Sequence, residues 1–516
     1  MAIIGLAAVA FVVLRPEVRL PELRPTGLVL PALLVPVAAL ILIAVQGFRG
    51  ALGYSWAMHD DAVWNVVTAR WLIEDRGVVT SLHSNPSPMT PLTIALAMAS
   101  GRHEPLLLLH DVSRAGELWI VLAATSSALA GFIALRVIPG SRSRILSALG
   151  ALAAAAVPLA WSAFGYALEF GFYNATISLV LLFACWLCWL ELPRSSELGM
   201  GALAVAAVGL LANWGPLAVI PAALFALEFV KLLRSRRTKR SFIVACASAL
   251  AVLAYLLLFT LPDLLSQSSA FTADGNIFPA TPLQVLAIII VSLLAIVGCA
   301  IAVRSVRTLL GVGSVVVGSS VALTYLILQR RNESPWGYYP IKFTWLLSSV
   351  LLTIAIGVVF GLAARIARWL VVPALLAACG LLAGVAWQMG PRYLPVKANV
   401  FPLVNIAMGT SGVAHLDPAA NVLLHLPSHT RTTIAVQLVS SEYDRFMNSW
   451  LLQLPAKSAQ DPVRTGAYYL DPENTEDVCT ELTRATGLVT VFTSRRSLAH
   501  ELASCTGPSF VVRVIG

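Results

Sequence analysis

Long apolar runs recur along most of the chain, separated by shorter polar stretches. A helix needs about 20 apolar residues to cross the hydrocarbon core of a bilayer, and shorter helices cross where packing allows. The candidate runs, of which the first is short for a span, lie at 1–14, 28–47, 116–136, 145–162, 173–190, 199–212, 215–230, 241–261, 283–303, 308–328, 342–362 and 369–388. The pattern predicts an α-helical polytopic membrane protein with about 11–12 transmembrane helices.

Arginine clusters fall in alternate loops between these runs, and such loops face the cytoplasm by the positive-inside rule. The clusters are Arg15/Arg19/Arg24, Arg136/Arg142/Arg144, Arg194, Arg234/Arg236/Arg237/Lys239/Arg240, Arg304/Arg307 and Arg365/Arg368. The opposite face then receives 48–115, 163–172, 262–282, 329–341 and everything after 388. We therefore predict a multi-pass plasma-membrane protein whose long loop and C-terminal segment are extracytoplasmic.

The C-terminal segment, 389–516, is more polar and predicts a small soluble α/β domain after a transmembrane domain at 1–388. Apolar residues recur there at helical spacing at Val439, Tyr443, Phe446, Met447, Trp450 and Leu454. Strands are predicted at 467–470, 488–492 and 509–515, and helices at 472–485 and 495–504. Cys479 and Cys505 could form one disulfide bond if this domain faces an oxidising compartment.

Composition excludes a cytosolic globular protein and a disordered one. Of the 516 residues, 58% are hydrophobic and only 12% are charged, against roughly 25% charged in soluble domains, and the mean hydropathy is +0.81. The net charge of +9 lies in short clusters between apolar runs, which indicates topology rather than a nucleic-acid partner. The cytoplasmic loops are too short for a catalytic domain, and the chain has no P-loop or Rossmann fingerprint, so we expect no nucleotide cofactor.

The long loop 48–115 carries the first candidate site, the adjacent acids Asp60 and Asp61. One carboxylate could act as a general base on an acceptor hydroxyl. The other could help to bind a divalent cation (Mg²⁺, Mn²⁺ or Ca²⁺) that neutralises a phosphate leaving group. The alternative is a helix N-terminus that Asp60 caps. His59 could be an acid, a base or a ligand beside the pair, or simply a hydrogen-bonded neighbour.

A second candidate site lies at 329–342, where positive charge departs from the positive-inside pattern. One interpretation is a lipid-phosphate site in which Arg330, Arg331 and Lys342 bind the phosphate while Trp336, Tyr338 and Tyr339 stack on a sugar. The other is an aromatic belt with snorkelling cations. Lys342 is favoured most, because apolar surroundings make a purely structural charge costly. Glu169 is a further candidate acid, or an interfacial residue.

This arrangement resembles the GT-C superfamily of polytopic glycosyltransferases, in which an acidic pair follows a membrane helix in the first long external loop. Asp60-Asp61, Ala69-Arg70 and the proline-bearing stretch Pro88-Met-Thr-Pro91-Leu match that layout. The Tyr-Tyr-x-x-Lys pattern that ends at Lys342 is similar to one in some actinobacterial members. The C-terminal part resembles actinobacterial cell-wall arabinosyl- and mannosyltransferases, and the Arg-rich, Lys-poor composition is compatible with a high-GC genome.

The resemblance implies an inverting hexosyl- or pentosyltransferase that takes a sugar from a polyprenyl-phosphate donor in the membrane lipid. The acceptor would be a cell-envelope glycan, lipid or protein, and Asp61 or Asp60 would deprotonate its hydroxyl. Arg70 would support the site. Two other functions stay open: a transporter or flippase of lipid-linked sugars, and a non-catalytic scaffold of envelope assembly. Convergence of the acid pair and the 330–342 cluster on one cavity that opens to the bilayer would favour the enzyme.

Overall fold

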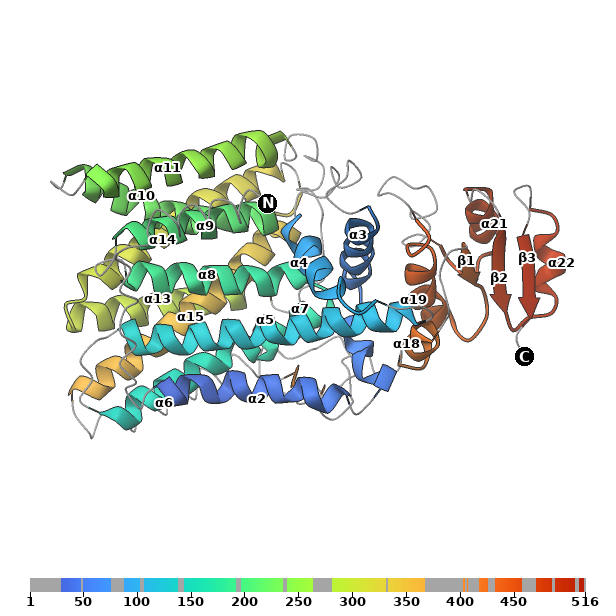
Figure 1. The fold of residues 1–516 in the computed structure, drawn as a ribbon, viewed down its shortest axis with the longest axis horizontal. Helices are drawn as coiled ribbons and strands as arrows, with labels where there is room; N and C mark the ends of the chain where they lie inside the picture. Colours follow the sequence, from blue (N-terminus) through green and yellow to red (C-terminus); the bar gives the residue numbers. More distant parts are fainter. Residues whose placement is uncertain are drawn as a thin grey trace.

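Figure 1 shows the computed structural model as a bundle of long helices with a small sheet unit beyond one end. The structure describes residues 29–47, 50–75, 88–102, 106–137, 143–191, 196–234, 239–262, 281–330, 333–366, 402–403, 406, 417–425, 432–456, 470–484, 488–505 and 510–514. Among these residues, eight helical segments are long and apolar enough to cross a membrane. The protein is therefore a polytopic helical membrane protein, as the apolar runs predict.

The bundle follows most of the predicted spans to within a few residues. Its long helices are α2 (Val29–Gly47), α5 (Leu107–Val137), α6 (Arg144–Ala156), α8 (Tyr173–Glu191), α9 (Ser196–Trp214), α10 (Val219–Arg234), α11 (Lys239–Tyr255), α13 (Pro282–Ala302), α14 (Val306–Gln329) and α15 (Tyr338–Ile366). The predicted spans 1–14 and 369–388 lie outside the described residues. α15 is the most buried of the eight spanning segments, and it packs on α13, α6 and α5.

The segment Glu197–Arg234 is 38 residues long, and one straight helix of that length would measure about 57 Å. That is nearly twice the roughly 30 Å thickness of a hydrocarbon core. The backbone instead becomes extended at Trp214 (φ −153°, ψ 91°), and a short 3-10 turn, η5 (Gly215–Ala218), leads into α10. α9 and α10 pack on each other, so the predicted runs 199–212 and 215–230 form two helices and not one.

Two predicted boundaries are wrong. α5 begins at Leu107 instead of 116, because tertiary ion pairs allow charged Asp111 to be buried in its first turns. The predicted exported loop 163–172 is largely helical: a π turn, η4 (Trp161–Gly165), continues into α7 (Tyr166–Glu169). Its side chains from Trp161 to Leu168 are buried, and a buried backbone must satisfy its own hydrogen bonds.

The predicted long loop is mostly folded at one end of the bundle. It contains the 3-10 helix η1 (Gly50–Ala57), α3 (Ala62–Glu74) and α4 (Met89–Met98). α4 packs on α3, α5 and α9. Figure 1 places α3 and α4 at the end of the bundle nearest the sheet unit. This end therefore brings together the acid pair and the C-terminal part.

The C-terminal part is α/β, as predicted. Its elements are α18 (Asp417–Leu424), β1 (Thr433–Ala435), α19 (Ser441–Leu451), α21 (Thr475–Arg484), β2 (Val489–Thr493), α22 (Leu498–Leu502) and β3 (Phe510–Val514). The strands form a three-stranded parallel sheet in the order β1-β2-β3. Cys479 and Cys505 form a disulfide bond beside this sheet.

The sequence missed β1, which is only three residues long, and the predicted strand 467–470 lies almost wholly outside the described residues. The sheet, α21 and α22 enclose a core of their own. By contrast, buried residues of α18 and α19 belong to the same apolar cluster as the helical bundle. The hydrophobic core of the bundle thus extends beyond residue 388, into the first helices of the C-terminal part.

Candidate functional site

The acid pair lies in a tight turn between η1 and α3, which we call the acid turn (His59–Asp61). Asp60 has a left-handed backbone (φ +46°), which is uncommon for a residue with a side chain. The amide of Ala62 donates to the carbonyl of His59 at 3.0 Å, and that of Val63 to Asp60 at 3.1 Å. Asp61 occupies the N-cap position of α3, but its side chain makes no capping hydrogen bond. The pair thus lies at a helix N-terminus, but the predicted capping by Asp60 is wrong, since Asp61 occupies that position.

Gly171, which follows α7, lies directly against the acid turn. A Cβ atom at this position would be 2.1 Å from the amide nitrogen of Ala62 and 2.5 Å from the carbonyl oxygen of His59. Gly171 also has a positive φ of 67°, a conformation that glycine adopts at little cost. The side-chain amide of Asn65 donates to the carbonyls of both Asp61 (3.0 Å) and Gly171 (3.2 Å). The acid turn is thus fixed to the segment that enters α8.

Lys342, in the first turns of α15, contacts the same segment and is 1% exposed. Its ammonium group donates to Asn174 Oδ1 at 3.1 Å and to the Tyr338 hydroxyl at 2.8 Å. It also lies 3.9 Å from the ring centroid of Phe172 and 5.8 Å from that of Trp214. Aromatic faces attract a cation, which partly offsets the loss of its hydration.

The two candidate sites of the sequence therefore meet across residues 171–174, where Gly171 contacts the acid turn and Phe172 and Asn174 contact Lys342. Lys342 and Asp61 are close enough for their charges to interact. The arrangement combines two carboxyl groups with a buried lysine in an aromatic setting. Such a set of groups can accept a proton on one side and stabilise an anionic leaving group on the other.

Asp60 has the properties of a group that exchanges protons near neutral pH. Desolvation, followed by the charge of Asp61, raises the pKa of Asp60 to about 7, although its side chain reaches solvent. Burial also raises the pKa of Asp61, and the ammonium of Lys342 opposes that shift. A general base is most effective when its pKa lies close to the working pH, so Asp60 is the better candidate for that role.

Because the pKa of Asp60 is raised, we expect the free energy of unfolding to fall as the pH rises. The folded state keeps the proton up to about pH 7, whereas an unperturbed carboxyl releases it near 3.8. The folded state therefore binds more protons between these values, and stability falls with rising pH. Thermal unfolding in EDTA at about pH 5 and about pH 8 should show this fall. Asp60→Asn should reduce it, and Asp75→Asn, at the other end of α3, should not. Equal pH dependence in wild type and Asp60→Asn would contradict the assignment.

The remaining predicted site residues are dispersed around this centre. Tyr339 stacks on Trp214 with ring centroids 6.1 Å apart. Arg330 is 1% exposed, donates to the carbonyl of Ser334, and lies against Gly337, so it shapes its own loop. Trp336 is half-buried in that loop, and Arg331 lies outside the described residues.

Two further predicted residues belong to or adjoin the acid turn: His59 is its first residue, and Glu169 ends α7. Glu169 is half-buried two positions before Gly171. His59 is 6% exposed, and its ring lies 5.8 Å from that of Phe446 in α19.

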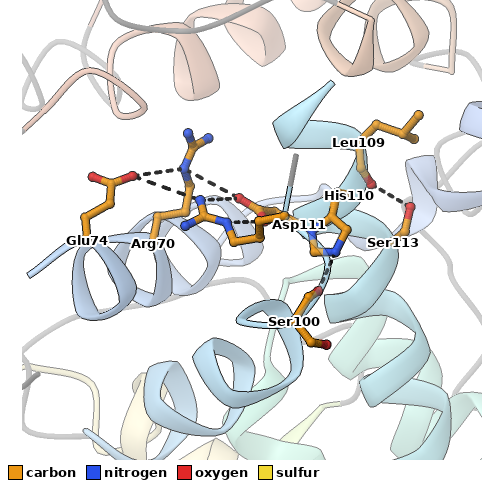
Figure 2. Close-up of polar contacts among 8 residues, drawn as sticks. Arg70, Glu74, Ser100, Leu109, His110, Asp111 and Ser113 are labelled. Carbon is orange, nitrogen blue, oxygen red and sulfur yellow. Dashed lines mark hydrogen bonds and ion pairs between the residues drawn. The ribbon is translucent and has the colours of Figure 1, made fainter. Parts of the chain in front are cut away.

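Arg70 belongs to a buried charge network that Figure 2 shows between α3 and the start of α5. Its centre is Asp111, which is fully buried and receives two hydrogen bonds from the Arg102 guanidinium, both at 3.0 Å. Arg70 lies 3.6 Å from the same carboxylate, and His110 contacts it at 3.2 Å. The network fixes α3, which begins at the acid turn, to α5.

Sequence reasoning missed Arg102 and Asp111 as partners of Arg70. Charged residues inside an apolar helix were the only available signal.

A second group that the sequence did not predict is Asn213, which holds the segment that contacts Lys342. Asn213 is fully buried, and its side-chain amide donates to the Asn174 carbonyl at 2.7 Å and to Ser178 Oγ at 2.9 Å. Thr90 in α4 donates to Asn213 Oδ1 at 2.6 Å. These bonds fix the residue that accepts from Lys342. The signal in the sequence was a lone asparagine between two apolar runs.

The acid pair suits a divalent cation only as part of a ligand set. Among the described residues, no cluster of three or more His, Cys, Asp or Glu side chains could hold a metal. Magnesium, however, is commonly held by one or two carboxylates together with substrate phosphates and water. Asp60 and Asp61 fit that mode, because among the described residues neither carboxylate makes a hydrogen bond or ion pair.

Comparison with known proteins does not assign this site. No protein-family model matches the chain, and no curated protein matches it. The functional interpretation therefore depends on the geometry of the acid turn and Lys342.

Proposed function

We propose that the protein is an integral-membrane glycosyltransferase that moves a sugar from a polyprenyl-phosphate donor to a cell-envelope acceptor. One observation carries the proposal: the acid turn and the buried Lys342 meet across residues 171–174 at one end of the helical bundle. A base and a phosphate-stabilising cation are the two functions that this transfer requires. We place this end, and the C-terminal part, on the extracytoplasmic face.

The transfer is a single displacement with inversion. The acceptor hydroxyl oxygen attacks the anomeric carbon and forms a new C–O bond while the bond from that carbon to the phosphate oxygen breaks. Asp60 takes the hydroxyl proton, since its pKa of about 7 suits a base at neutral pH. The electron pair of the broken bond leaves on the polyprenyl phosphate, where the ammonium of Lys342 stabilises the negative charge. A divalent cation held by Asp61 together with the substrate phosphate and water would supply further neutralisation of the phosphate.

Radiolabelled polyprenyl-phosphate arabinose, mannose and glucose, offered in turn to membrane vesicles of defined orientation, test the proposal. We expect one donor to give labelled product, with the donor supplied on the predicted extracytoplasmic face. Vesicles without the protein are the control, and EDTA tests the need for a cation. Binding of a polyprenyl phosphate without transfer from any donor would refute the enzyme and favour a flippase or scaffold.

Lys342→Met is expected to lower kcat/KM for the donor about 100-fold, because hydrogen bonds to charged groups contribute about 1.5–3 kcal/mol. The melting temperature should change little, since removing a buried charge while keeping an apolar stem offsets the loss of the hydrogen bonds to Asn174 and Tyr338. The dependence of the initial rate on donor concentration checks the first effect, and thermal unfolding checks the second.

Lys231→Met is the matched control for this prediction, because the Lys231 side chain is 40% exposed and lies in the last turn of α10. It should leave kcat/KM unchanged. A wild-type kcat/KM in Lys342→Met would show that Lys342 does not act on the donor.

A further inference from the structure

α19 of the C-terminal part makes direct contact with the acid turn. The indole N–H of Trp450 donates to the carbonyl of Met58 at 3.1 Å, two positions before Asp60. Both residues are fully buried. One turn earlier along α19, the Phe446 ring lies 5.8 Å from the imidazole of His59. The segment that carries the acids is therefore held by a helix almost four hundred residues later in the chain.

A second tryptophan makes the reciprocal contact. Trp71, on α3, donates its indole N–H to the carbonyl of Ala456 at 2.7 Å, and Trp71 is 4% exposed. α3 begins immediately after Asp61, and Trp71 lies ten positions beyond Asp61, so a second hydrogen bond holds the helix that follows the acid turn to the C-terminal part. Each bond pairs a buried indole with a buried backbone carbonyl, and a carbonyl left without a partner in such a place is costly.

α19 is also tied to the sheet. The Asn448 side chain accepts from the amide of Ala435 and donates to its carbonyl, both at 2.7 Å. Asp444 accepts from the amide of Leu438 at 2.8 Å. Asn448 and Asp444 are both buried. α19 thus connects the end of β1 to the acid turn through two sets of specific hydrogen bonds.

We propose that Trp450 is a positioning residue for the acid pair, and that it acts through the carbonyl of Met58. This inference rests on the proposed function for its kinetic consequence, but not for its structural one. The left-handed conformation of Asp60 is unfavourable on its own and persists only where the surroundings impose it. The Trp450 bond is one of those constraints, so the C-terminal part is an integral portion of the catalytic centre.

Trp450→Phe removes the N–H and keeps an aromatic ring, and Trp71→Phe does the same at the reciprocal contact. Trp189→Phe is the matched control. Trp189 is fully buried and also donates its indole N–H to a backbone carbonyl, that of Arg307 at 3.3 Å, but it lies near the end of α8, remote from the acid turn along that helix. All three variants should unfold cooperatively and elute from a size-exclusion column at the same volume as the wild-type protein.

Hydrogen exchange of peptides spanning the acid turn gives a readout that does not need activity. We expect about tenfold faster exchange at the amides of Ala62 and Val63 in Trp450→Phe and in Trp71→Phe, because opening of the turn becomes easier. Trp189→Phe should exchange there as wild type does. Unchanged exchange in Trp450→Phe would overturn the inference, whatever the enzyme assay shows.

The kinetic readout is the split between kcat and KM. A displaced base should lower kcat at least tenfold while leaving KM for the donor within about twofold. Faster exchange together with no transfer by the wild-type protein would refute the glycosyltransferase and leave the positioning contact in place. Faster exchange with wild-type kcat in Trp450→Phe would show that the contact does not position the base.

Discussion

Replacing Asp60 by asparagine is expected to lower kcat for sugar transfer by about 10²–10⁴, the usual contribution of a positioned general base. The fold should be retained, because the Asp60 side chain is exposed and the turn is held by backbone contacts. Initial rates at saturating donor, beside the melting temperature of each variant, measure both effects. Asp75→Asn provides the control, since it removes a carboxylate from the other end of the same helix.

Asp61→Asn separates the roles of the two acids. The charge of Asp61 raises the pKa of Asp60, so removing that charge should move the acidic limb of the pH profile of kcat/KM to lower pH. Asp60→Asn should instead remove that limb, because the group that titrates is gone. If Asp60→Asn retains both the rate and the limb, Asp60 is not the base.

Replacing Gly171 by alanine is expected to disrupt the acid turn. The new Cβ would lie 2.1 Å from the amide nitrogen of Ala62 and 2.7 Å from that of Asp61, closer than atoms can approach, and the positive φ adds strain. We expect a loss of about 2 kcal/mol or more in the free energy of unfolding. Transfer should fall about 100-fold, because small displacements of a base are that costly.

Gly201→Ala, in α9, is the matched control, since nothing lies within 4 Å of the position of its Cβ. Alanine there should stabilise the protein by roughly 0.5–1 kcal/mol, because glycine is a poor helix former. Denaturant unfolding of both variants, with the transfer assay, tests the pair. Wild-type stability and activity in Gly171→Ala would show that the acid turn can move away from this segment without consequence.

Local chemistry explains which parts of the site were predictable. Lys342 stood out because a charge in apolar surroundings is costly unless it has a use, and Asp60 and Asp61 stood out as adjacent acids in a long loop. Arg330 stood out because positive charge there departs from the positive-inside pattern, yet it turns inward and donates to Ser334 in its own loop. A residue type can thus indicate that a charge needs a partner without indicating which partner satisfies it.

The sequence by itself determined that this is a helical membrane protein, where most of its helices lie, and that its C-terminal part is α/β. Those properties depend on runs and periodicities within about 20 residues, which hydrophobic burial and backbone hydrogen bonding convert directly into helices. The amphipathic helix around Trp450 was predicted in this way and appears as α19.

Only the tertiary structure decided which residues surround the acid pair. Lys342 reaches Asn174 across 168 positions of sequence, and Trp450 reaches Met58 across 392. Gly171 carries no side chain, so only the closeness of the acid turn reveals why it is glycine. Such contacts depend on how packed helices bring distant segments together, and no local pattern encodes them. The site therefore arises from the fold, although its charged residues are visible in the sequence.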